Sequence, residues 1–367
     1  MSSLINAEKW KKDVLSIKKR LKKKRIKKEK ALKKKVSRVI INLLEKIKHK
    51  GDNLIMAFSL QKDYNILEES SQRKKGIIQK ITVQKKRNKV IIENLRAIGE
   101  TDRAIAIENC GTCLEISDCK EQGERITAAN FCRQRLCIVC ASRRQAKFVA
   151  QMIPTLEYLA AHGYTEARYA HVVLTVKNVE GDKLKEAIRE ILKAYEKLRK
   201  AREWERSVLG AVRSLEVSYN SESGTYHPHL HVIILKQKYL PQKTLQSMWQ
   251  KAASTEYKPG VYIRDIPAEE QGQAVAETLK YALKYGKVTE KPETLKTVFE
   301  ALYGKRLISF SGEFAKARRA LKLKDIETEE PLTDTLEGIK PNSQIIKYIC
   351  CWDVSGGYYE IKREDET

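Results

Sequence analysis

Three of the six histidines fall at alternate positions within the short stretch "TYHPHLHVIIL" at 225–235. Successive side chains of a β-strand point to opposite faces of the sheet. If this stretch is a strand, His229 and His231 share one face and lie about 7 Å apart along the chain. His227 belongs to the same face, but Pro228 separates it from the regular strand. The pattern therefore predicts a functional pair, His229 and His231, with His227 beside it.

Two imidazoles and a carboxylate form a workable open site for a divalent metal ion. The strand predicted before the histidines, "GAVRSLEVSYN", contains Glu216 and leads into the histidine strand through the short turn "SESG". The sequence leaves the register between these two strands open. Glu216 is therefore a candidate third ligand, and a purely structural set of histidines is the alternative.

Six of the eight cysteines cluster within 110–140. Four of them form two Cys-x-x-Cys pairs, namely Cys110, Cys113, Cys137 and Cys140. Two such pairs, separated by about two dozen residues, are typical of a tetrahedral four-thiolate zinc site. Cys132 or Cys119 can replace one of these ligands. Four thiolates leave no open position for chemistry, so we expect a structural zinc, with reduced, buried cysteines as the alternative.

A third set of reactive side chains lies in "AETLKYALKYG". Four residues fall at i, i+3, i+4 and i+7 and share one face of the predicted helix: Glu277, Lys280, Tyr281 and Lys284. Tyr285 follows one turn after Tyr281. A phenolate can attack phosphorus, lysines can neutralise phosphate, and a carboxylate can act as a base. On a helix alone these residues are also typical of a solvated surface, so their meaning depends on the histidines.

The elements around these residues alternate in a regular order. Strands are predicted at 167–176, 210–220, 226–235 and 261–266, and helices at 183–204, 242–254 and 269–286. This βαββαβ order is the split-βαβ or ferredoxin-like pattern, in which the first and third strands lie side by side at the centre. We therefore expect an α+β fold. Its antiparallel sheet has a ferredoxin-like core plus the tyrosine helix, preceded by a cysteine zinc-binding region and a basic helical N-terminal extension.

The predicted organisation has four parts. Residues 1–100 form a basic extension, largely helical or partly disordered, and 101–165 form the cysteine region with a helix. Residues 166–325 form the domain with the histidines and tyrosines, and 326–367 form an acidic linker and a hairpin.

Charge predicts the class of partner. The chain of 367 residues has 72 Lys and Arg against 47 Asp and Glu, a net charge of +25. Such a field concentrates polyanions, most commonly nucleic acid. An anionic membrane is the rival, but no segment reaches the roughly 18 apolar residues that a membrane span needs. The N-terminus also lacks the apolar core of a signal peptide, so we expect a cytosolic protein.

With these motifs together, the chain resembles the plasmid rolling-circle replication initiators of the HUH endonuclease superfamily, over roughly 110–325. The matching segments, in order, are "FCRQRLCIVC", "HVVLTV", "GAVRSLEVSYN" with "YHPHLHVIIL", "ETLKYALKY" and "GKRLISFSGEFAKARRAL". His229-Leu230-His231 matches the histidine–hydrophobic–histidine motif of that family. The long basic N-terminus is not part of the family pattern.

The resemblance implies a role for each matching residue. His229 and His231 bind Mg²⁺ or Mn²⁺ with Glu216 as a third ligand. Tyr281 is the nucleophile, and Lys284 supports the phosphate. Either Glu277 with water or Tyr285 completes the terminating step.

The function implied is a nick in one strand of plasmid origin DNA, presented as a single strand or an extruded hairpin. The tyrosine keeps the 5′-phosphate and releases a 3′-hydroxyl primer for a host polymerase, with a host helicase as a further partner. No Gly-x4-Gly-Lys-Ser/Thr loop points to a fused helicase. The alternatives are a transposase of the same superfamily and a non-catalytic zinc-knuckle DNA-binding protein. The second would leave "HPHLH" and "ETLKY" unexplained.

Overall fold

The computed structural model describes residues 76–119, 123–164, 168–266, 287–328, 331–337 and 345–363. The chain divides into two compact units, Met1–Lys75 and Gly76–Thr367, and all described residues belong to the second. The predicted basic extension therefore lies outside the described residues as far as Lys75. The predicted tyrosine helix at 269–286 also lies outside them.

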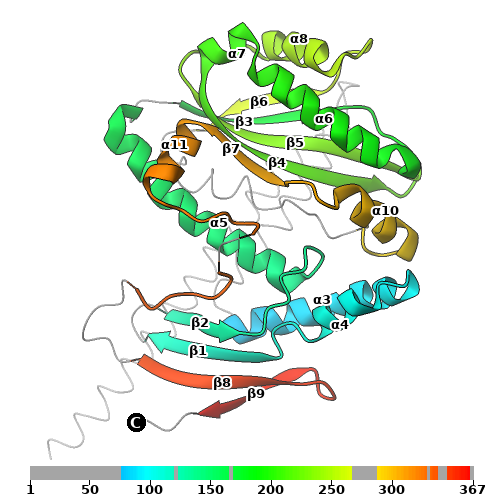
Figure 1. Cartoon of the computed structure of the whole chain (residues 1–367), viewed down its shortest axis with the longest axis vertical. Helices are drawn as coiled ribbons and strands as arrows, with labels where there is room; N and C mark the ends of the chain where they lie inside the picture. Colours follow the sequence, from blue (N-terminus) through cyan, green and yellow to red (C-terminus); the bar gives the residue numbers. More distant parts are fainter. Residues whose placement is uncertain are drawn as a thin grey trace, which may run out of the picture. The chain divides into compact units, whose positions relative to one another are not determined.

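A five-stranded antiparallel sheet occupies the middle of the sequence (Figure 1). Its strands are β3 (Arg168–Thr175), β4 (Val208–Asn220), β5 (Thr225–Lys236), β6 (Val261–Asp265) and β7 (Ile308–Gly312). They lie in the order β6-β3-β5-β4-β7, so the strand with the histidines is central and has β3 and β4 as neighbours. The predicted α+β fold with an antiparallel sheet is confirmed.

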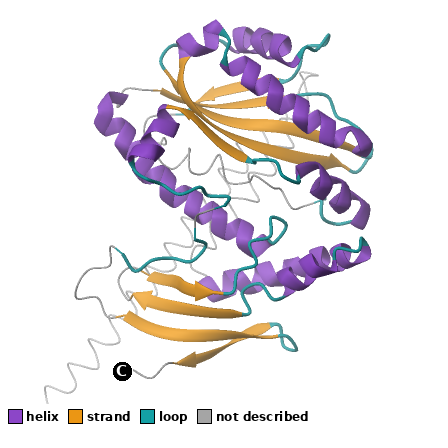
Figure 2. Ribbon diagram, viewed as in Figure 1, coloured by secondary structure: helices purple, strands orange, loops and turns teal. Residues whose placement is uncertain are grey.

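Helices cover both faces of this sheet (Figure 2). The helices between its strands are η2 (Gly181–Lys183), α6 (Leu184–Arg199), α7 (Arg202–Ser207) and α8 (Gln242–Ala253). The helices that follow β6 in the described residues are α10 (Pro292–Leu302) and α11 (Glu313–Ala320). α6 forms because its apolar residues recur at helical spacing and give a fully buried stripe, which includes Leu184, Ile188 and Leu198.

Alternation along β5 divides its side chains between two surroundings. Leu230, Val232 and Ile234 are fully buried in the apolar core that α6 and α8 complete. Ile233 and Leu235 point to the opposite face, into a second core with residues of α5 and α11. Burying each such aliphatic side chain contributes roughly 1.5–3 kcal/mol. The histidines continue the second face toward the start of the strand, and the apolar packing on both sides fixes their orientation.

A second antiparallel sheet joins distant parts of the sequence. Its four strands lie in the order β2 (Gly123–Ala129), β1 (Cys113–Cys119), β8 (Ile345–Asp353) and β9 (Tyr358–Arg363). The sequence predicted the C-terminal hairpin as part of a terminal segment. In the structure β8 pairs along the whole of β1, so the hairpin extends the sheet of the cysteine region.

Three helices accompany this sheet in the described chain. They are α3 (Ile77–Ala97), α4 (Thr101–Glu108) and the long α5 (Ile138–Leu159), which continues into the π-helical turn η1 (Ala160–Tyr164). The predicted acidic linker is anchored here, because Asp334 contacts Arg143 at 2.6 Å and Lys147 at 3.2 Å, both on α5. None of the helices in the described segments has the length and apolar composition to cross a membrane.

Candidate functional site

Strand pairing brings Glu216, His229 and His231 together. Glu216 on β4 lies directly opposite His229 on β5 in the register of the two strands. Its Oε1 atom is 3.6 Å from Nε2 of His229, and its Oε2 atom is 3.2 Å from Nε2 of His231. The possible ligand atoms of these three residues all lie within 4.8 Å of one another. The register that the sequence left open therefore places the carboxylate beside both imidazoles.

The chemistry of this triad fits a divalent cation. Glu216 is only 2% exposed and His229 only 8%, and a buried carboxylate attracts a cation more strongly than an exposed one does. Nε2 of His231 and Oγ of Ser214 are also buried, and neither makes a hydrogen bond within the described part of the chain. Two imidazole nitrogens and a carboxylate oxygen suit Mn²⁺ well and Mg²⁺ acceptably. The residues present therefore fit the predicted metal site.

The outward nitrogen of each imidazole has its own partner. Nδ1 of His229 lies 3.1 Å from the carbonyl oxygen of His227, which can only accept, so Nδ1 donates. Nδ1 of His231 lies 3.1 Å from Nε2 of His171 on β3. These contacts turn both Nε2 atoms toward Glu216, as outer contacts commonly orient metal-binding histidines.

His171 is a site residue that the sequence analysis missed. The register pairs Val173 with His231, so His171 lies diagonal to His231 on the same face of the sheet. Burial lowers the pKa of His171 to about 3, with smaller contributions from His231 and Arg264. The available signal was a single histidine in the otherwise apolar strand "HVVLTV", which becomes informative only once that strand is known to pair with β5.

His227 lies beside the triad and outside it, as expected from Pro228. Its Nδ1 atom is 2.7 Å from Oδ1 of Asn178. Burial lowers the pKa of His227 to about 4, and His229 adds to this shift. The side chain of His227 therefore serves as a matched comparison for the two histidines of the triad.

The predicted residues of the tyrosine helix all lie outside the described residues. They are Glu277, Lys280, Tyr281, Lys284 and Tyr285. Their proposed roles stay predictions from the sequence.

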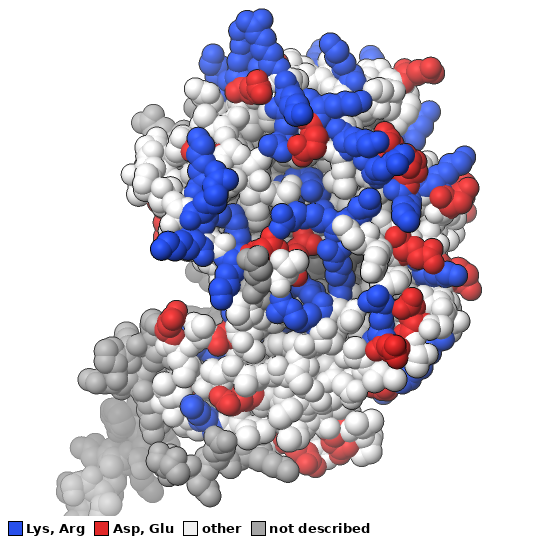
Figure 3. Space-filling view, viewed as in Figure 1, with Lys and Arg blue, Asp and Glu red and all other residues white. Residues whose placement is uncertain are grey.

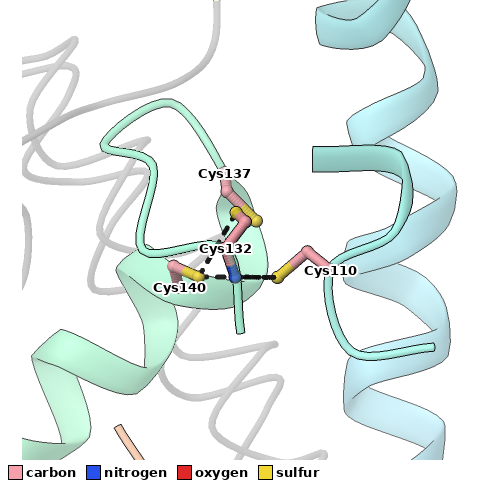
Figure 4. A group of neighbouring side chains, drawn as sticks. All are labelled: Cys110, Cys132, Cys137 and Cys140. Carbon is pink, nitrogen blue, oxygen red and sulfur yellow. Dashed lines mark hydrogen bonds between the residues drawn. The ribbon is translucent and has the colours of Figure 1, made fainter. Parts of the chain in front are cut away.

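Four cysteines converge where the start of α5 meets the turn before β1 (Figure 4). They are Cys110, Cys132, Cys137 and Cys140. Sγ of Cys140 lies 3.5 Å from Sγ of Cys110 and 3.7 Å from Sγ of Cys132. A tetrahedral zinc ion with four thiolates spaces its sulfur atoms by about 3.8 Å, given Zn–S bonds of about 2.3 Å. The group therefore has nearly the dimensions that a structural zinc needs.

One of the four preferred zinc ligands is placed elsewhere by the structure. Cys113 begins β1, and strand pairing sets it opposite Cys351 on β8, away from the cluster. Cys132 takes the fourth position in its place, which is one of the two replacements that the sequence left open. Cys119, the other replacement, is buried at the far end of β1. The Cys-x-x-Cys spacing does not bring Cys113 into the group, because this cysteine already belongs to a strand.

Polar groups around Cys137 favour its thiolate form. Nδ2 of Asn88 donates to Sγ of Cys137 at 3.4 Å. Hydrogen bonds from the thiols of Cys110, Cys132 and Cys140 hold the pKa of Cys137 well below its ordinary value. Cys137 also immediately precedes the N-terminus of α5, where the helix dipole favours negative charge.

A buried lysine of the same helix as Asn88 also lies beside the cluster. Lys85 on α3 is 6% exposed, and its Nζ atom donates to the carbonyl oxygens of Cys110 at 2.8 Å and Glu108 at 3.1 Å. Its positive charge offsets part of the negative charge that four thiolates would leave on a zinc site.

Oxidation of the protein with diamide is expected to link Cys113 to Cys351 without loss of metal. The backbone N–H of Trp352 donates to the carbonyl oxygen of Thr112 at 2.8 Å, so the neighbouring cysteines form a non-hydrogen-bonded pair. Such a pair has a Cα separation of about 4.5 Å, which a disulfide can span. Peptide mapping by mass spectrometry and a zinc assay on the same sample test this expectation. A Cys351→Ser variant should prevent the link, and a link to Cys132 with release of metal would contradict the placement of Cys113.

Comparison with known proteins gives one family. A family model described as Replication protein (Rep_1) matches residues 123–360. This span contains the whole triad of Glu216, His229 and His231, and also three of the four clustered cysteines.

The regions similar to individual relatives cover most of each relative's length. A "Protein rep" of Streptococcus pneumoniae serotype 2 (strain D39 / NCTC 7466) is 28% identical over 270 residues, which cover 70% of this chain and 84% of the relative. A "Protein rep" of Bacillus amyloliquefaciens is 30% identical over 309 residues, with 74% and 89% covered. A "Protein rep" of Lactiplantibacillus plantarum is 32% identical over 263 residues, with 64% and 82% covered. No solved structure matches this chain.

Proposed function

The chain belongs to the Rep_1 family of replication proteins, and on that premise we propose that it initiates plasmid rolling-circle replication by nicking one strand of the origin. The observation that carries this proposal is the triad of Glu216, His229 and His231 on adjacent central strands. A DNA-binding protein without catalysis does not require two imidazoles that face a buried carboxylate. A nuclease could use these three residues to hold the cation that polarises a scissile phosphate.

The fold around the triad supports a nuclease domain at 166–325. We interpret β3, α6, β4, β5, α8 and β6 as a ferredoxin-like βαββαβ core. The sheet order β6-β3-β5-β4 supports this interpretation, as do the helices that follow β3 and β5 in the chain, α6 and α8. The core would hold the triad rigidly, because His229 and His231 are paired with strands on both sides and Glu216 is paired with His229.

The residues would divide the reaction as follows. Oη of Tyr281 forms a bond to phosphorus, and the bond from phosphorus to the 3′-oxygen breaks. The 3′-oxygen leaves and takes a proton as the primer hydroxyl, while the tyrosine retains the 5′-phosphate. Lys284 neutralises phosphate charge. A divalent cation, Mg²⁺ or Mn²⁺, would supply polarisation of the scissile phosphate when bound by Glu216, His229 and His231.

The phosphotyrosyl ester conserves the energy of the broken phosphodiester. A 3′-hydroxyl can therefore reverse the reaction and rejoin the strand without a nucleotide triphosphate. Glu277, acting on water, or Tyr285, acting as a second nucleophile, would end the cycle. A host helicase and polymerase would supply unwinding and synthesis in the cytosol.

Charge on the surface supports DNA as the substrate. Figure 3 shows Lys and Arg side chains gathered over the part of the molecule that carries α6, α7, α8 and α11, with fewer over the four-stranded sheet. With a net charge of +25 this field would draw the DNA backbone toward the domain that contains the triad. The clustered cysteines would bind a structural zinc ion beside it.

Replacing both His229 and His231 with alanine is expected to remove metal-dependent nicking and leave DNA binding largely intact. The variant loses the two imidazole nitrogens that would bind the metal ion, whereas the basic surface that would contact phosphate is unchanged. The measurement is cleavage of a single-stranded origin oligonucleotide with Mn²⁺, in parallel with its binding affinity at fixed salt.

His227→Ala provides the matched control for this experiment. It removes a third imidazole from the same face but keeps the backbone carbonyl that accepts from His229. This variant should still nick. Undiminished cleavage by the double variant would rule out the metal role of the triad.

A further inference from the structure

The two histidines of the triad are oriented by chemically different partners. The carbonyl oxygen that faces Nδ1 of His229 can only accept a hydrogen bond, so the backbone itself fixes the proton of His229 on Nδ1. The partner of His231 is instead the imidazole of His171, at 3.1 Å between Nε2 and Nδ1. An imidazole can donate or accept, so the direction of this second hydrogen bond depends on the tautomers of His171 and His231.

That direction decides whether His231 can bind a cation. A neutral imidazole carries one proton, on Nδ1 or on Nε2. If Nδ1 of His231 donates to His171, Nε2 keeps its lone pair and faces Glu216 at 3.2 Å. If His171 donates instead, the proton of His231 lies on Nε2, between the ring and the carboxylate. That proton would occupy the position where a metal ion must bind.

The contact is also geometrically constrained. The two rings are nearly parallel, at 5° between planes and 5.3 Å between centroids. β3 and β5 are paired over eight residues, and apolar side chains of both strands pack into the cores on the two faces of the sheet. This packing restricts the positions of both rings. His171 is thus held by the sheet in a fixed position relative to His231. Ser214, which lies opposite His231 on β4, makes no hydrogen bond to it among the described residues.

We propose that His171 is a positioning residue that accepts the Nδ1 proton of His231 and so keeps Nε2 of His231 free for the cation. This inference rests on the proposed metal role of the triad. It adds a fourth side chain, from a third strand, to the functional set. In this role His171 would act through His231 and would not itself bind the cation.

The test compares three forms of the full-length protein without DNA. His171→Phe keeps the ring volume and removes both nitrogens. His171→Gln retains a side-chain oxygen that can accept the proton. Mn²⁺ affinity, measured by the loss of the free-ion electron paramagnetic resonance signal, is expected to fall about 10- to 100-fold in His171→Phe and to recover partly in His171→Gln. Circular dichroism and the melting temperature should show that both variants stay folded.

A second readout reports the proton directly. The chain has only six histidines, so ¹⁵N signals of labelled imidazoles can be assigned by single replacements. Wild-type His231 should carry its proton on Nδ1, and His171→Phe should shift its population toward Nε2–H.

The outcomes separate this inference from the proposed function. Wild-type protein that binds no Mn²⁺ would overturn both. Wild-type protein that binds Mn²⁺, with His171→Phe binding equally well, would overturn only the role of His171, as would a wild-type proton on Nε2 of His231. If His171→Phe proves unfolded, His171→Gln and the wild-type ¹⁵N spectrum still decide the matter.

Discussion

The Tyr281→Phe variant is expected to form no covalent adduct with an origin oligonucleotide, a loss of more than about 1,000-fold relative to the wild type. Phenylalanine keeps the ring but lacks the oxygen that would attack phosphorus. Because the tyrosine would retain the 5′-phosphate, an oligonucleotide labelled at its 3′ end should transfer its label to the protein. An oligonucleotide labelled at its 5′ end should instead give a free, shortened product. Denaturing gels of both reactions with Mn²⁺ measure the effect.

Tyr285→Phe is the matched control, four residues further along the same predicted helix. It should still form the first adduct. If Tyr285 ends the cycle, this variant should accumulate the adduct and fail to transfer a second strand. If Glu277 with water ends it, both steps should persist. Full adduct formation by Tyr281→Phe would refute its assignment as the nucleophile, and loss of the adduct in Tyr285→Phe would transfer that role to Tyr285.

The Cys132→Ser variant is expected to lose the structural zinc, whereas Cys113→Ser keeps it. Removing one of four thiolates opens the coordination shell, and the binding energy of a structural zinc contributes directly to folding. Wild-type protein and Cys113→Ser should each contain about one zinc per chain, and Cys132→Ser close to none. Elemental analysis after preparation without chelators measures the metal. The melting temperature of Cys132→Ser should fall as well.

This pair of variants distinguishes the ligand set predicted from the Cys-x-x-Cys spacing from the set that the structure brings together. The Cys-x-x-Cys pattern alone favours Cys113 as a ligand, whereas the structure places Cys132 within 3.7 Å of Cys140. Loss of zinc in Cys113→Ser with retention in Cys132→Ser would support the spacing against the structure. An absence of zinc from all three proteins would refute a zinc site.

The histidine strand shows how much of the site local sequence could predict. The period of two in a strand places His229 and His231 on one face, whatever the rest of the chain does. The turn "SESG" between Asn220 and Thr225 is short, so β4 and β5 must be antiparallel neighbours. A shift of one residue in that pairing would still have turned Glu216 away from the imidazoles. Only the paired strands decide that Glu216 faces His229.

Contacts between distant segments account for what the sequence left open or missed. β1 pairs with β8, more than 200 residues later, and no local pattern announces that partner. This pairing sets Cys113 opposite Cys351 and leaves the fourth position of the cluster to Cys132. His171 was overlooked for the same reason, because its contact with His231 depends on β3 lying beside β5.

The sequence by itself therefore determined which reactive residue types are present and the short-range order of the chain. Residue type, strand and helix period and charge are local properties, and they suffice to predict an α+β fold, a histidine pair, a cysteine cluster and a nucleic-acid partner. The tertiary structure decided which of these residues meet. It places Glu216 beside the histidines, Cys132 rather than Cys113 in the cysteine cluster, and His171 beside His231. Each of these placements depends on the register or pairing of strands that are separate in sequence.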